Sequence, residues 1–270
     1  MAQAPVVSTN GKQQTATRGE RTETMTYGDF RAIVTGKDSK WVMGGFTLPD
    51  GTEWKYREPN ATVIVEHQKL RVRANPLTRS HDRIQVLDNA KHMYYSAARF
   101  EPPDDGEIAV ELTIAARRHN GREGDLYDGM ATVNLLDFNT GAAIDFFATN
   151  DKIATVYGRV LFPGVAVEPP ADLNRPTYFC IFNELDVPTK PGQPHLYRIT
   201  YDKAKDTLVW YVDGNEVDRH DNVPMKIDSF LIALGLMTEK AIDNDRSVSL
   251  HGQGLTGEWS PITITKTYRS

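Results

Sequence analysis

The sequence has little cysteine, no long apolar run and no excess of positive charge, and each of these absences excludes a class of protein. A single cysteine, Cys180, cannot form a disulfide bond within the chain, so no disulfide framework supports the fold. Cys180 lies in the apolar run 178–182, where we expect a buried, unreactive thiol rather than a nucleophile. No segment approaches the ~18 consecutive apolar residues that a membrane-spanning helix needs, so we expect no membrane partner. The 31 basic and 36 acidic residues give a net charge of −5 without a basic stripe, which argues against a nucleic-acid partner.

Sequence motifs for nucleotide cofactors and for zinc are missing as well. The chain contains no G-x-x-x-x-G-K-[ST] loop and no strand-anchored G-x-G-x-x-G motif. The seven histidines are scattered, and none shows the spacing of a zinc site. Residues 124–129 and 243–245 are acidic enough to bind calcium weakly, but we interpret them as solvated loops. We therefore expect neither a cofactor nor a metal site.

The N-terminal residues lack the features of a secretory signal. Residues 1–22 are rich in Gln, Thr, Ser and Gly and show no apolar periodicity, so we interpret them as a disordered leader. With a single cysteine, a reducing compartment fits best, and we expect the protein in the cytoplasm.

Short strand-like runs separated by turn signals fill the chain from Tyr27 onward, and no amphipathic helix is evident. Period-two alternation in residues 107–116 would place four apolar side chains on one face of a strand. The Asp213–Gly214 pair is a strong signal for a short hairpin. This pattern predicts an all-β fold, a jelly-roll sandwich of two antiparallel sheets formed by residues 23–270 as one domain. Residues 238–248 are charged and polar, so we expect a loop there that could cover a cleft.

The segment 141–164, GAAIDFFATNDKIATVYGRVLFPG, carries the most informative motif. It resembles the active-site strand of family 16 glycoside hydrolases, which reads E-x-D-x-x-E and is followed by roughly K-V-Y-G-x-V-x-x-P-G. In this chain Ala143, Asp145 and Ala148 stand at the three acidic positions. A retaining glycosidase needs two carboxylates about 5 Å apart, and a methyl group cannot replace either. The resemblance therefore implies a glucanase-like scaffold without standard glucanase chemistry.

A wider resemblance supports the same scaffold. Residues 195–202 (HLYRITYD) and 208–214 (LVWYVDG) resemble a pattern of the concanavalin A-like lectin/glucanase superfamily, and the matches run in the family's order over about residues 60–268. The chain is also similar to an uncharacterised domain-of-unknown-function family, through residues 145–150 and 252–254. The first resemblance implies a concanavalin A-like jelly roll, and the second implies no activity.

Asp145 is the main candidate for chemistry in the cleft of such a fold. Alternation along its strand would place Ala143 in the cleft, together with Phe147 or, through a bulge, Ala148. An apolar cleft would raise the pKa of Asp145 and prepare it for proton transfer. The alternative is a structural carboxylate that accepts hydrogen bonds between strands.

Tyr157 and Arg159 are two further catalytic candidates. They alternate on the next strand, so we expect them to share a face and to flank Asp145, where they could stabilise negative charge. The alternative is a tyrosine at the rim and an exposed arginine. The predicted catalytic residues are Asp145, Tyr157 and Arg159.

Several other side chains could contact a substrate. Asn134 is polar in an apolar strand, so it either contacts a ligand or is a satisfied core amide. One of Tyr94 and Tyr95 should point into the cleft. Glu184 could supply a relocated carboxylate, with a salt bridge at a strand end as the alternative, and the loop of His251 could reach the cleft. The predicted substrate-binding residues are Asn134, Phe147, Tyr95, Glu184 and His251.

Three functions are consistent with these residues. A largely apolar cleft suits a small-molecule ligand, so the first is a cofactor-independent enzyme acting on a small hydrophobic molecule, such as a cyclase, isomerase or lyase of specialised metabolism. The second is a noncatalytic carbohydrate- or small-molecule-binding protein. The third is a glycoside hydrolase or polysaccharide lyase with relocated catalytic residues. A closed apolar pocket around Asp145 would favour the first, coplanar aromatic rings in an open groove would favour glycan binding, and a relocated acidic pair would favour the third.

Overall fold

The fold is built almost entirely from β-strands. The computed structural model describes residues 13–17, 19–28, 30, 39–47, 50–82, 90–160, 162, 165, 179–240 and 242–269. In these ranges the only helix is a single 3₁₀ turn, η1 (Leu126–Asp128). The described residues therefore contain no helix that is long and apolar enough to span a membrane. The predicted all-β class is confirmed.

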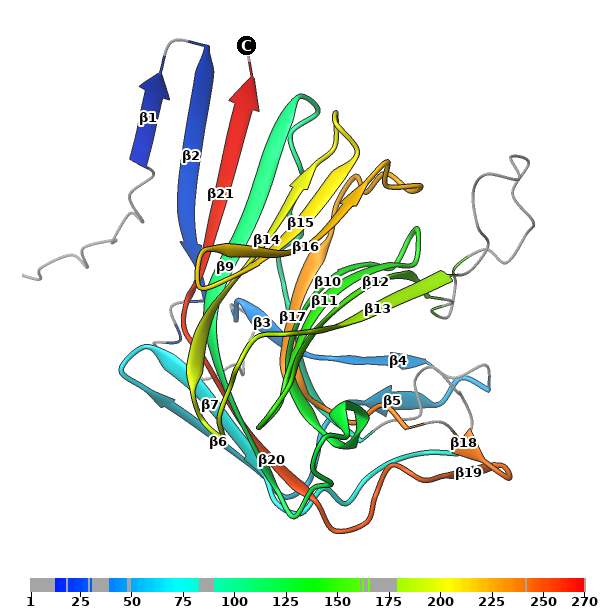
Figure 1. Ribbon diagram of the computed structural model, residues 1–270. Helices are drawn as coiled ribbons and strands as arrows, with labels where there is room; N and C mark the ends of the chain where they lie inside the picture. Colours follow the sequence, from blue (N-terminus) through cyan, green and yellow to red (C-terminus); the bar gives the residue numbers. More distant parts are fainter. Residues whose placement is uncertain are drawn as a thin grey trace, which may run out of the picture.

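Two large antiparallel sheets pack face to face (Figure 1). The first has the order β1-β2-β21-β9-β14-β15-β16, and β20, β7 and β6 extend it beside β9. Its strands are β1 (Gln13–Thr17), β2 (Glu20–Tyr27), β6 (Ala61–Glu66), β7 (Lys69–Ala74), β9 (Gly106–His119), β14 (Pro194–Asp202), β15 (Thr207–Val212), β16 (Asn215–Asp221), β20 (Gly254–Trp259) and β21 (Ile262–Arg269). The second sheet has the order β13-β12-β11-β10-β17-β8-β3. Its strands are β3 (Trp41–Met43), β8 (Lys91–Ser96), β10 (Met130–Asp137), β11 (Ala142–Ala148), β12 (Ile153–Arg159), β13 (Phe179–Leu185) and β17 (Leu231–Met237).

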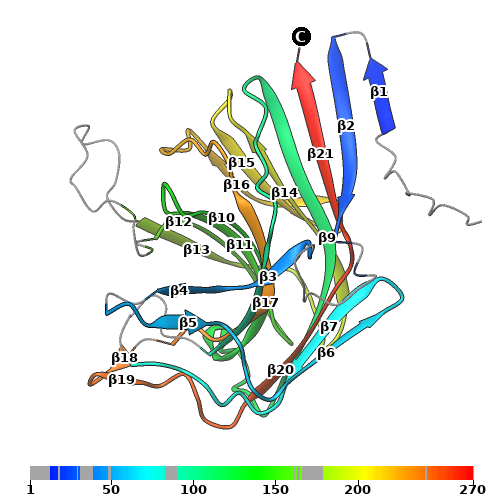
Figure 2. The same cartoon turned by 180° about the vertical axis from the view of Figure 1, so that it is seen from behind.

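Two small hairpins complete the described structure. β4 (Gly45–Thr47) pairs with β5 (Glu53–Lys55), and β18 (Ile242–Asp243) pairs with β19 (Arg246–Ser247). The β4–β5 hairpin lies beside the seven-stranded sheet, on the side away from the ten-stranded one (Figure 2).

The main core lies between the two large sheets. The alternation predicted for residues 107–116 is confirmed, because every second side chain from Ile108 to Ile114 is at most 2% exposed. Trp210 and Trp259 of the ten-stranded sheet are fully buried in this core. Their indole nitrogens donate across it, from Trp210 to the Asp145 backbone oxygen (3.2 Å) and from Trp259 to the Thr132 backbone oxygen (3.0 Å). A buried indole N–H needs such a partner, so these two bonds tie β11 and β10 to the opposite sheet.

The structure corrects two expectations outside the cleft. The predicted leader, residues 1–22, includes β1 and the start of β2, and β2 pairs along its whole length with β21. Backbone pairing orders this Thr- and Glu-rich stretch without an apolar face, and residues 1–12 lie outside the described ranges. Cys180, expected to be buried, is exposed because β13 is the edge strand of its sheet.

Candidate functional site

A pocket lies on the face of the seven-stranded sheet that points away from the core. Strand alternation builds this face, since β11 presents Ala143, Asp145 and Phe147 to it and turns its even-numbered residues toward the core. The register between β11 and β12 is regular from Ala142 to Ala148, so no bulge rotates Ala148 into the cleft. Ala148 faces the core. Of the two positions that carry catalytic acids in the hydrolases, only Ala143 therefore lines the pocket.

The β4–β5 hairpin turns this face into a partly covered pocket. Backbone hydrogen bonds join it to β8, from the Gly44 N–H to the Met93 carbonyl (2.8 Å) and from the Met93 N–H to the Tyr56 carbonyl (3.1 Å). A side chain at Gly44 would meet the Tyr95 ring at 2.9 Å, so glycine permits this close approach. The pocket holds about 450 Å³ of empty space including its mouth. Its apolar wall consists of Met93, Leu136, Ala143, Val160, Phe162 and Met237.

Asp145 lies in the floor of this pocket with little access to water. It is 6% exposed, and its Oδ1 atom is buried and accepts no hydrogen bond within the described part of the chain. Burial raises the pKa of Asp145 well above its ordinary value, the negative charge of Glu239 raises this pKa further, and the positive charge of Lys91 lowers it. Asp145 therefore keeps its proton to a higher pH than an ordinary carboxyl group.

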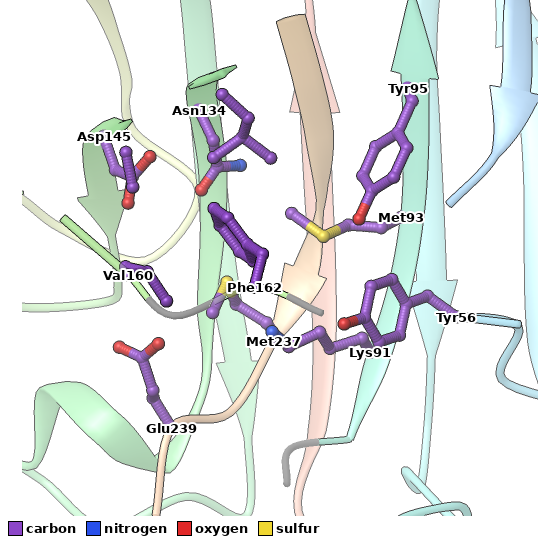
Figure 3. A pocket seen from close by; sticks show the side chains of 12 residues that line it. Tyr56, Lys91, Met93, Tyr95, Asn134, Asp145, Val160, Phe162, Met237 and Glu239 are labelled. Atoms are coloured by element: carbon purple, nitrogen blue, oxygen red, sulfur yellow. The ribbon is translucent and has the colours of Figure 1, made fainter. Parts of the chain in front are cut away.

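Glu239 and Lys91 bring opposite charges to the same pocket (Figure 3). Glu239 is the second residue after β17, and its N–H donates to the Tyr127 carbonyl at 2.9 Å. Burial raises the pKa of Glu239, and Lys91 lowers it. Lys91 begins β8, is 9% exposed, and holds its Nζ atom 5.0 Å from the centre of the Tyr56 ring. In Figure 3 the two carboxyl groups lie on one side of the pocket, and Lys91, Tyr56 and Tyr95 come from the other.

The tyrosines and Asn134 add neutral polar groups. Burial raises the pKa of Tyr56 and of Tyr95, so both phenols stay neutral and can act as hydrogen-bond donors. Asn134 lines the pocket, and its Nδ2 donates to the Thr132 hydroxyl (2.9 Å) and to the Ala233 carbonyl (3.3 Å). Both interpretations of Asn134 thus hold in part, since it is a bonded amide that also faces the pocket.

Tyr157 and Arg159 do not flank Asp145. Asp145 pairs with Val156, so the even-numbered residues of β12 share its face and the odd-numbered ones point the other way. Tyr157 is 1% exposed in the main core, where its ring contacts Phe179 at 5.0 Å between centres. The Arg159 Nε atom donates to the Thr140 carbonyl at 3.0 Å. Our expectation was wrong because it placed the two strands one residue out of register.

Of the other predicted contacts, only Tyr95 lines the pocket together with Asn134. Phe147 is buried on the same sheet face but packs against Phe182, with ring centres 6.3 Å apart. Glu184 forms an ion pair with Lys152, which is the ordinary alternative that we had considered.

His251 also lies away from the pocket lining. Its Nε2 atom lies 2.7 Å from Oδ1 of the fully buried Asp128, in η1. Its loop therefore packs against η1 and does not reach Asp145.

The sequence reasoning missed Lys91 and Glu239. Lys91 is the first residue of its strand, and Glu239 is the second residue after its strand, so their charge resembles that of ordinary solvated strand ends. No signal in the sequence identifies them, because they meet only through the pairing of Lys91 with Met237, which Glu239 follows two residues later. Among the residues described, no three His, Cys, Asp or Glu side chains are grouped so that they could hold a metal ion.

Comparisons with known proteins agree with this fold. A family model described as a family of unknown function, DUF6081, matches residues 27–268, and no curated protein matches the sequence. The structure of an endo-1,3-beta-glucanase from Streptomyces sioyaensis is similar at 12% identity, over 99% of this chain and 100% of that chain, with a TM-score of 0.55. An endo-beta-1,4-glucuronan lyase from the fungus Trichoderma reesei is similar at 11% identity, over 77% of this chain and 88% of that chain, with a TM-score of 0.51.

A third similar structure is much longer than this protein. The chain spans 17% of a sialidase chain, with 83% of this chain covered, 12% identity and a TM-score of 0.45. At such identities the likeness shows the fold alone. The predicted concanavalin A-like jelly roll, a fold shared by glucanases and lyases, is confirmed.

Proposed function

Because the chain belongs to DUF6081, a family of unknown function, we propose its activity from the pocket: a cofactor-independent enzyme that moves a proton on a small, largely hydrophobic molecule. Cyclisation, isomerisation and elimination are the reactions that such a site could catalyse. One observation carries the proposal, namely the buried carboxyl group of Asp145 in a mostly apolar pocket, with one oxygen that has no hydrogen-bond partner among the residues that the structure describes. A carboxyl group in such surroundings has the raised pKa that acid–base catalysis near neutral pH requires.

The two carboxyl groups divide the acid and base roles. The charge of Glu239 raises the pKa of Asp145, which fits Glu239 losing its proton first. Ionised Glu239 then removes a proton from the carbon next to a substrate carbonyl group, and neutral Asp145 donates its proton to the carbonyl oxygen. The electrons of the broken C–H bond form a carbon–carbon double bond, and the π electrons of the carbonyl bond move to its oxygen. The ammonium group of Lys91 stabilises the negative charge that develops on this oxygen before the proton arrives.

A reaction with a simple probe tests this base. In 5-nitrobenzisoxazole a carboxylate removes the ring C–H proton, the N–O bond breaks, and a nitrile and a coloured phenolate form. We expect the protein to accelerate this reaction over its heat-denatured form, and Glu239→Gln to lower kcat/KM at least about a hundredfold, at the low end of what a positioned base contributes. Glu184→Gln is the matched control, because that carboxyl group is exposed and paired outside the pocket. Equal rates for the native and denatured protein would exclude the proposed base.

A second function has support from one specific observation, the presence of Asp145 and Glu239 in a single pocket. Two acids that replace the lost pair could serve a glycoside hydrolase or polysaccharide lyase. Incubation with laminari-oligosaccharides and with glucuronan oligosaccharides, followed by measurement of new reducing ends and of unsaturated products, tests this candidate. Cleavage that is lost in Glu239→Gln would favour this second function over the first.

A further inference from the structure

We propose that the hollow beside the acid–base pocket binds the planar, conjugated part of the ligand, whose oxygen function then lies near Lys91, Asp145 and Glu239. This inference rests on the proposed function and names the ligand class of the same site. The hollow holds about 620 Å³ of empty space and shares Tyr56, Tyr95 and Phe162 with the acid–base pocket. A ligand that fills both spaces must therefore be elongated, with its polar group at one end.

Aromatic side chains form most of the hollow. Of the seven residues in the described part of the chain that line it, five are aromatic: Phe46, Tyr56, Tyr95, Phe138 and Phe162. They form a continuous series of neighbouring rings, with centres 5.6 Å apart for Phe46 and Tyr56, 6.5 Å for Tyr56 and Tyr95, 5.6 Å for Tyr95 and Phe138, and 4.9 Å for Phe138 and Phe162. The five rings come from the β4–β5 region, from β8 and from the segments after β10 and β12. Four separate parts of the chain thus contribute rings to one space.

The ring orientations favour a flat, conjugated ligand over a sugar. Neighbouring rings meet at angles of 49° to 76°, so they surround a space and do not form a flat platform for a pyranose ring. Such a space offers both ring faces and ring edges to an aromatic or polyene guest, the arrangements that aromatic pairs prefer. Among the described residues that line the hollow, Thr47 and Gly45 are the only non-aromatic ones, so besides the Tyr56 and Tyr95 hydroxyls few groups are available for the hydroxyls of a sugar.

The ammonium group of Lys91 disfavours a cationic ligand beside the Tyr56 ring. Aromatic rings around a space can bind a quaternary ammonium group. Here, however, Lys91 already places its ammonium group 5.0 Å from the centre of the Tyr56 ring. Lys91 would repel a second cation beside this ring, whereas it would attract a carbonyl or enolate oxygen there. The ligand is therefore neutral or carries its negative charge on that oxygen.

Binding of matched probes tests this ligand class. The probe is 2-acetylnaphthalene, and its controls are 2-ethylnaphthalene, which lacks the oxygen, and 2-acetyldecalin, which lacks the conjugation. Dissociation constants from ligand-detected saturation-transfer NMR should be smallest for 2-acetylnaphthalene. Phe138→Leu should weaken its binding about two- to tenfold, the range that one aromatic pair contributes, and should leave 2-acetyldecalin within twofold. Phe182→Leu is the matched control, because Phe182 is half-buried on the same sheet but does not line the hollow.

The outcomes separate this inference from the proposed function. If Glu239→Gln abolishes the 5-nitrobenzisoxazole reaction while Phe138→Leu leaves naphthalene binding unchanged, the inference fails and the proposed base stands. If 2-acetylnaphthalene binds in a way that depends on Phe138 but the protein does not accelerate the 5-nitrobenzisoxazole reaction, the inference is supported and the proposed enzymatic activity is contradicted. Tighter binding of laminari-oligosaccharides or of tetramethylammonium than of 2-acetylnaphthalene, lost in Phe138→Leu, would overturn the inference.

Discussion

Replacing Asp145 with asparagine should stabilise this protein, and the gain should grow with pH. A carboxyl group whose folded-state pKa is raised binds its proton more tightly in the folded than in the unfolded chain. Between the unfolded pKa of about 3.9 and the raised folded value, the unfolded chain loses this proton first, so the free energy of unfolding falls as the pH rises. The asparagine side chain cannot ionise, so in the variant this residue does not lower the free energy of unfolding as the pH rises.

The size of the effect follows from the surroundings of the carboxyl group. Asp145 is 6% exposed, and its Oδ1 atom is buried without a hydrogen-bond partner in the described structure. Each unit by which burial raises the pKa of this carboxyl group costs the folded state about 1.4 kcal/mol once the pH lies above the raised value. Since 1 kcal/mol corresponds to about 2–4 °C in Tm for a chain of this size, we expect Asp145→Asn to melt at least about 2 °C above the wild type at pH 8. The difference should vanish, or reverse slightly because of the new amide N–H₂ group, near pH 4.

Thermal unfolding followed by circular dichroism between pH 4 and pH 9 measures this difference. Glu184→Gln provides a control of opposite sign, because its carboxyl group is exposed and paired with Lys152. Loss of such a surface pair costs about 0.2–1 kcal/mol, so this variant should melt slightly below the wild type at pH 8. If Asp145→Asn is less stable than the wild type by the same amount at every pH, Asp145 is a structural hydrogen-bond acceptor and our assignment of its proton is wrong.

Two further variants test the corrected positions of His251 and Tyr157, and a third tests the close packing of β17 against β8. His251→Ala should lower the free energy of unfolding by about 1–3 kcal/mol, because Asp128 would lose a partner while fully buried, and it should leave the 5-nitrobenzisoxazole rate within twofold. Tyr157→Phe should likewise keep that rate within twofold, and a larger loss would return Tyr157 to the catalytic set. Gly235→Ala should destabilise the fold by about 1–3 kcal/mol in urea unfolding, because its Cβ atom would lie 2.5 Å from the Met93 side chain and 2.6 Å from a backbone oxygen of β8.

The sandwich could be predicted from the sequence because alternation and turn chemistry are local properties. Residues 107–116 form the strand that their apolar alternation indicates, and the Asp213–Gly214 pair closes the β15–β16 hairpin. Asp145 and Ala143 could be placed on the cleft face for the same reason, since both lie on one face of one strand.

The rest of the site depends on pairing between strands, which a single sequence does not specify. Tyr157 was assigned to the wrong face because the register of β11 against β12 sets its direction, and a shift of one residue reverses every side chain. Glu239 and Lys91 meet only because β17 pairs with β8, two strands far apart in the chain. The hollow depends on the β4–β5 hairpin, whose contact with β8 no local pattern indicated.

The two indole bonds across the core have a consequence for how new activities could arise in this protein. Trp210 and Trp259 hold main-chain oxygens of β11 and β10, so they anchor these strands independently of the side chains that the strands present to the pocket. Residues such as Leu136 and Ala143 can therefore be randomised in a directed-evolution library while the frame that carries them keeps its geometry. Replacing either tryptophan should instead reduce the number of library members that fold, whichever chemistry is selected.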